Sequence, residues 1–128
     1  MGYRSDVTIA MTVDAQKKFE VALAAADEKT KNEVKELLAL ADYNRITKYG
    51  WLLVFTGVKW YNDCKECIDV RFIEDFLNHE DSSSYLYYRI GEELDDIELQ
   101  GDWLANPYEV YLYRHIDFDL LEEEDEEE

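Results

Sequence analysis

Hydrophobic residues recur along the chain with two periods, one typical of strands and one typical of helices. Residues 3–13 alternate between polar and apolar positions, which predicts a half-buried strand. Apolar residues three and four apart over 15–27 and 31–42 follow the capping residues Asp14 and Thr30. The first third of the chain is therefore expected to fold as a strand followed by two helices, either separate or fused into one.

The rest of the chain carries further strand and helix patterns. Residues 42–50 read as a connector, and the apolar, β-rich run WLLVFTGVKWY over 51–61 predicts a central strand. Helical spacing of apolar residues over 64–78 predicts a third helix. Three further strands are expected over 85–93, 95–101 and 108–118.

This order, β-α-α-β-α-β-β-β, indicates an α+β fold. Three closing strands in succession favour antiparallel pairing, so we expect an antiparallel sheet of about five strands with two to three helices on one face. One domain over 1–120 is expected. The segment 121–128, with seven consecutive acidic residues, is expected to be a disordered tail.

Charge changes the picture because it is unevenly placed. The formal net charge is −18, with nine Lys/Arg and eight Asp/Glu in residues 1–60 but four and twenty-three in residues 61–128. Such a field repels nucleic acid and attracts basic surfaces, which are common on nucleic-acid-binding proteins. No signal peptide and no apolar run of about 20 residues is visible, so a cytoplasmic protein with no membrane contact and reduced cysteines is expected.

The stretch RIGEELDDIELQGD, residues 89–102, concentrates six carboxylates around one arginine. It lacks the spacing of a calcium loop and a partner nucleophile for acid–base catalysis, so neither a metal nor a catalytic role is predicted. On a hairpin, Glu93, Asp95 and Asp102 would face solvent if Leu94, Ile97 and Leu99 help to cover the core. The stretch is then either a guarded sheet edge or a partner-binding face.

Tyrosines accompany this acidic stretch on the predicted strands. Tyr is favoured at interfaces because it buries a large area at low entropic cost, although several of these side chains could equally pack under the helices. The candidate partner-binding residues are Glu92, Glu93, Asp95, Asp96, Glu98, Asp102, Tyr111 and Tyr113.

A second motif, Cys64-Lys65-Glu66-Cys67, follows a predicted strand and opens a helix. Dithiol oxidoreductases place their cysteines in this way. Neighbouring acids disfavour the thiolate, the three closing strands do not fit a thioredoxin order, and no second C-x-x-C is present for zinc. Incidental cysteines are the favoured interpretation, and no cofactor is predicted.

Three segments carry a resemblance to a known group: GYRSDV (2–7), VKWY (58–61) and YRIGEELDDIE (88–98). They resemble small proteins encoded by phages and prophages. The resemblance implies a compact α+β domain of viral or mobile-element origin and no known activity. The CKEC motif and the acidic tail do not belong to that pattern.

Together, charge and resemblance favour a non-enzymatic inhibitor or modulator that acts in the host cytoplasm. It would bind a host protein with a basic or nucleic-acid-binding surface, for example as an anti-CRISPR or anti-restriction protein that imitates nucleic-acid charge. The alternatives are a thiol oxidoreductase using Cys64 and Cys67, and a structural phage protein that self-associates.

Overall fold

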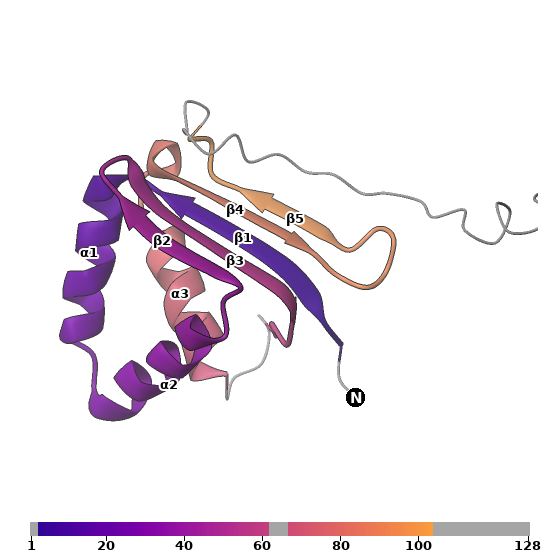
Figure 1. Ribbon diagram of the computed structural model, residues 1–128, viewed down its shortest axis with the longest axis horizontal. Helices are drawn as coiled ribbons and strands as arrows, with labels where there is room; N and C mark the ends of the chain where they lie inside the picture. The colour runs from indigo at the N-terminus through magenta and orange to yellow at the C-terminus, as the bar shows by residue number, and fades with distance from the viewer. Residues whose placement is uncertain (1–2, 62–66, 104–128) are drawn as a thin grey trace, which may run out of the picture.

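A computed structural model describes residues 3–61 and 67–103, and it has the predicted α+β architecture (Figure 1). Within these residues five strands form one sheet in the order β2-β3-β1-β4-β5, and every neighbouring pair is antiparallel. The elements in chain order are β1 (Ser5–Met11), α1 (Val13–Ala24), α2 (Glu28–Ala39), β2 (Tyr43–Thr47), β3 (Gly50–Val58), α3 (Ile68–Asn78), a 3₁₀ turn (Ser82–Ser84), β4 (Tyr85–Ile90) and β5 (Ile97–Gln100).

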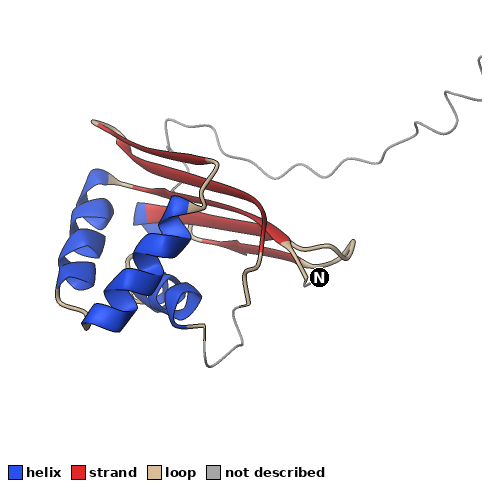
Figure 2. Cartoon of the chain, turned by 60° about the horizontal axis from the view of Figure 1, so that its bottom comes forward, coloured by secondary structure: helices blue, strands red, loops and turns tan. Residues whose placement is uncertain are grey.

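All three helices cover the same face of the sheet (Figure 2). The alternation in β1 determines which side chains point toward them: Val7, Ile9 and Met11 are fully buried in the core. Phe19 of α1 makes edge-on ring contacts with Trp51 of β3, at 5.4 Å between centroids, and with side chains of α3. The apolar faces of the strands and helices therefore pack together in one aromatic-rich core.

The first two helices begin at side-chain caps, which are Thr12 and Asp27 and not the expected Asp14 and Thr30. The start of α3 has no side-chain cap. Thr12 accepts a hydrogen bond from the backbone N–H of Ala15 at the start of α1, and Asp27 accepts one from Thr30 at the start of α2. The cap at Asp27 marks the start of a separate second helix. The two helices are therefore not fused, which the sequence pattern did not decide. The third helix begins at Ile68, four residues later than expected. Among the described residues, no helix is long and apolar enough to span a bilayer.

The expected connector over 42–50 is wrong in part, because Tyr43–Thr47 form the edge strand β2. This strand pairs with β3 through a tight turn at Lys48 and Tyr49 that ends on Gly50, whose φ of +147° suits glycine. Its sequence, YNRIT, is polar and exposed, so it carries no apolar alternation. The expected strand 108–118 and the acidic tail 121–128 lie outside the described residues.

The register of β4 on β1 places a charged residue, Arg89, on the helix-covered face of the sheet. Val7 pairs with Arg89 and Ile9 pairs with Tyr87, so both β4 side chains share the helix-covered face. On the next strand, Glu98 pairs with Arg89 and therefore faces the same way. The expectation that Leu99 helps to cover the core is wrong, because this register turns it to the helix-free face, where its side chain is 53% exposed.

Candidate functional site

The acidic stretch forms the end of the β4–β5 hairpin, with residues 91–96 connecting the two strands. Its carboxylates divide into two groups by exposure. Asp96 and Glu98 are half-buried and reach back into the protein. The other four are exposed: Glu92, Glu93, Asp95 and Asp102.

Arg89 holds the half-buried pair of carboxylates. Its guanidinium makes a two-point contact with Asp96, with Nη2 to Oδ1 at 2.7 Å and Nη1 to Oδ2 at 3.2 Å. Nε donates to Glu98 Oε1 at 2.8 Å, and Nη1 also donates to the Ser5 hydroxyl at 3.0 Å. Arg89, whose side chain is 9% exposed, thereby ties β4 to β1, to the hairpin turn and to β5.

Arg89 remains protonated in this position. Burial alone would lower the pKa of the guanidinium, but the hydrogen bonds and negative charges of Asp96 and Glu98 raise it above its usual value. A buried cation is tolerated where its donors are satisfied by paired acceptors. The two carboxylates are thus structural partners of Arg89.

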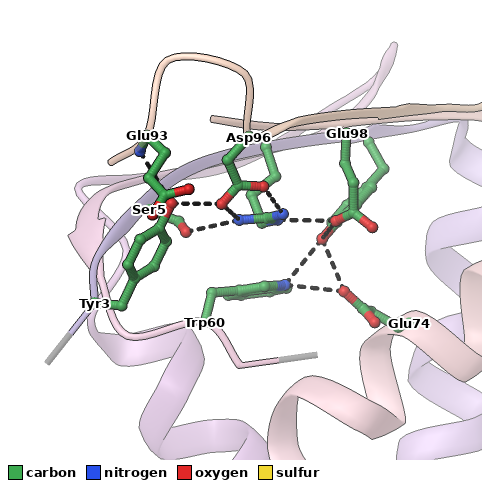
Figure 3. A network of polar contacts seen from close by, with 9 residues as sticks. Tyr3, Ser5, Trp60, Glu74, Glu93, Asp96 and Glu98 are labelled. Atoms are coloured by element: carbon green, nitrogen blue, oxygen red, sulfur yellow. Dashed lines mark hydrogen bonds and ion pairs between the residues drawn. The ribbon is translucent and has the colours of Figure 1, made fainter. Parts of the chain in front are cut away.

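A second layer lies beneath the ion pairs, between the sheet and α3 (Figure 3). The Tyr87 hydroxyl donates to Glu74 Oε2 at 2.8 Å and lies 3.3 Å from Glu98 Oε1. The Trp60 indole N–H is shared between the Tyr87 oxygen at 3.0 Å and Glu74 Oε2 at 3.1 Å. Burial, and then the Glu74 carboxylate, raise the pKa of Tyr87, so this hydroxyl remains a donor.

The start of the chain fastens the tip of the hairpin from outside. The Tyr3 hydroxyl donates to Asp96 Oδ2 at 2.6 Å and accepts the backbone N–H of Glu93 at 3.0 Å (Figure 3). The bond to Asp96 raises the pKa of Tyr3. The backbone N–H of Arg4 donates to Glu92 Oε2 at 2.6 Å. The exposed acids therefore project from a turn that is anchored at several points.

Gly91 is the residue that makes this compact turn sterically feasible. A Cβ at this position would lie 2.0 Å from Asp96 Oδ2 and 2.5 Å from the Tyr3 hydroxyl. The backbone N–H of Gly91 donates to the Asp96 carbonyl at 2.7 Å and closes the turn. The segment RIGEELDDIE thus contains the Arg89 clamp, which consists of Arg89, the acceptors Asp96 and Glu98, and Gly91, whose lack of a Cβ leaves room for them.

Exposure of Glu93, Asp95 and Asp102 agrees with the sequence-based expectation. Glu93 and Asp95 lie in the β4–β5 turn, as expected, whereas Asp102 follows β5. Leu94 does not cover the core, because it sits at the tip of the turn and is 73% exposed. The engagement of Asp96 and Glu98 by Arg89 was missed. The one signal for it was a lone arginine among six carboxylates on a short hairpin. Tyr111 and Tyr113 lie outside the described residues.

The cysteine motif is described only at its end. Cys67 is the half-buried residue before α3, and its carbonyl accepts the backbone N–H of Arg71 at 3.1 Å. Cys64 lies outside the described residues, so the favoured interpretation of incidental cysteines and the oxidoreductase alternative both stay predictions. Across 3–61 and 67–103, no group of three or more His, Cys, Asp or Glu side chains is arranged to hold a metal ion.

Comparisons with protein-family models, with curated proteins and with solved structures gave no match. The resemblance to phage and prophage proteins therefore remains a prediction from three sequence segments.

Proposed function

We propose that this protein is a non-enzymatic, phage-type modulator that binds a basic surface of a host protein through the tip of the β4–β5 hairpin. The binding group is the acidic tip, defined as Glu92, Glu93 and Asp95. The observation that carries the proposal is the anchoring of this tip by Arg89, Tyr3 and Arg4.

Carboxylates on an anchored turn favour binding to arginine and lysine clusters for two reasons. A preorganised backbone loses little conformational entropy when it binds. The turn also gathers the charges in one place, and complementary potentials accelerate and orient the encounter. Three exposed acids within four residues, on a chain of net charge −18, supply such a surface.

A surface of this kind suits a host protein whose basic site normally binds nucleic acid. Occupation of that site by carboxylates would block the nucleic acid, which is the anti-defence version of the proposal. Asp102 is exposed but follows β5, at the end of the hairpin away from the tip. Tyr111 and Tyr113 lie outside the described residues, so their part in binding stays a prediction.

Capture of partners from a bacterial lysate tests the proposal. The wild-type chain is compared with a triple variant, Glu92→Lys, Glu93→Lys and Asp95→Lys. This variant leaves the carboxylates bound to Arg89 unchanged but removes the Glu92 acceptor of the Arg4 backbone N–H. A matched control reverses three exposed acids on the helices: Glu28→Lys, Glu36→Lys and Asp75→Lys.

We expect the wild type and the control to retain the same basic protein at low salt, and the tip variant to lose it. Because surface charges are screened within about 8 Å at physiological ionic strength and closer at higher salt, the captured protein should elute with salt. Retention by the tip variant, or capture that withstands high salt, would exclude the acidic tip as the binding group.

A further inference from the structure

The opposite edge of the sheet has the opposite chemical character. β2 lies at one end of the strand order and β5 at the other (Figure 1). The twenty residues 43–62, which include β2 and β3, contain no Asp or Glu in a chain that has 31 of them. Arg45 and Lys48, on β2 and its turn, are both exposed.

The β2 edge also exposes apolar and aromatic surface. The side chain of Ile46 is 52% exposed and that of Tyr49 is 56% exposed. Each cation lies over a neighbouring ring: Arg45 Cζ is 5.3 Å from the centroid of Tyr43, and Lys48 Nζ is 5.2 Å from the centroid of Tyr49. These cation–π contacts keep both charges beside the strand.

The acidic tip does not cancel this local charge. The two edges are four strand positions apart, or about 19 Å at about 4.8 Å per strand. This separation exceeds the screening length of about 8 Å at physiological ionic strength. Against the two cations, the nearest acid in sequence is the single Asp42, whose Oδ2 accepts the backbone N–H of Thr56 on β3 at 2.6 Å.

We infer that β2 is a docking edge for an extended segment of a partner protein that carries carboxylate side chains. The segment would add to the sheet on the side of β2 that faces away from β3, which is the one strand that β2 pairs with among the described residues. Its carboxylates would meet Arg45 and Lys48, and its apolar side chains would contact Ile46 and Tyr49. This surface is separate from the acidic tip and does not depend on the proposed function.

A defined peptide tests the inference on the full chain. The probe is a capped peptide of alternating Val and Glu, with otherwise identical peptides in which Gln or Lys replaces Glu. Backbone amide shifts and hydrogen exchange are followed by NMR. We expect shifts and slowed exchange in Tyr43–Thr47 with the Glu peptide, and binding at least tenfold weaker with the Gln or Lys peptides.

Two charge variants make the test specific. Arg45→Glu with Lys48→Glu should weaken binding of the Glu peptide at least tenfold, whereas Lys29→Glu with Lys35→Glu on α2 should leave it unchanged. Equal binding of the Lys peptide would overturn the inference, because Arg45 and Lys48 would then not select carboxylates. No response in β2 would overturn it as well, because the edge would then not bind an extended segment. Sedimentation at two concentrations supplies the last check: a dimer whose β2 amides are protected without peptide would assign the edge to a second copy and overturn it too.

Discussion

Arg89 and Asp96 stand seven residues apart and face each other across the β4–β5 turn in a two-point ion pair, with the shorter contact at 2.7 Å. The pair is joined by Glu98 on the same guanidinium. The guanidinium offsets the repulsion between neighbouring carboxylates and holds the turn closed. It also separates the acids that hold the fold from those that face solvent.

Removal of the arginine should therefore be costly. In Arg89→Ala, the half-buried Asp96 and Glu98 lose their cation, and the free energy of unfolding should fall by about 2–4 kcal/mol. The loss is smaller than for a fully buried pair because the side chains of Asp96 and Glu98 are 30% and 34% exposed. Urea unfolding followed by tryptophan fluorescence measures it. Arg45→Ala, on the exposed edge strand, should change stability by less than about 0.5 kcal/mol, and an equal effect of the two would refute the clamp.

Gly91→Ala should open the turn. The added Cβ would displace the Asp96 carboxylate from Arg89, at a cost of about 1–3 kcal/mol. Hydrogen exchange at residues 89–98 should accelerate more than elsewhere in the protein.

Gly57→Ala is a matched control for that variant. Gly57 has a φ of +65°, and a Cβ there meets nothing within 4 Å, so its cost of about 1–2 kcal/mol is purely conformational. Exchange in the hairpin should stay as in the wild type. If both glycine variants loosen residues 89–98 alike, the steric role of Gly91 is wrong.

The free energy of unfolding should fall at alkaline pH because of Tyr87. Burial and the Glu74 carboxylate raise its pKa above the ordinary 10.0, so the unfolded chain loses the proton at a lower pH than the folded one. The stabilisation is complete below about pH 10 and is lost as pH rises further, by up to about 1.4 kcal/mol per pH unit. Unfolding free energies at about pH 8, 9.5 and 11 should decline more steeply for the wild type than for Tyr87→Phe.

The control for this pH profile is Tyr49→Phe, because Tyr49 is 56% exposed and lies far from Glu74 in sequence. It should keep the wild-type slope. Identical slopes for all three proteins would show that Tyr87 does not contribute to the alkaline transition.

The sequence predicted the fold class because the core elements carry strong periods. Val7, Ile9 and Met11 alternate as a strand, and the helices repeat at three and four residues. β2 was missed because an exposed edge strand needs no apolar alternation, so YNRIT reads like a loop. Its pairing is determined by the turn at Lys48 and Tyr49 and by its fit to β3.

The candidate site was predicted only in part, for a different physical reason. Exposure of Glu93 and Asp95 follows from their place in a polar turn. The partners of Asp96 depend on strand register and on Tyr3, which lies 93 residues away in sequence. A one-residue slip in register would have exposed Arg89 and buried Leu99, and local pattern does not distinguish the two.

The salt dependence of binding to the captured host protein tests the central claim most directly. The dissociation constant is measured from about 0.1 to about 0.5 M salt, where the screening length falls to about 4–5 Å. The account predicts at least tenfold weakening over this range for the wild type and the helix control, and a similar loss already at low salt for Glu92→Lys with Glu93→Lys and Asp95→Lys. An affinity that is unchanged at high salt, or by these three substitutions, would contradict it.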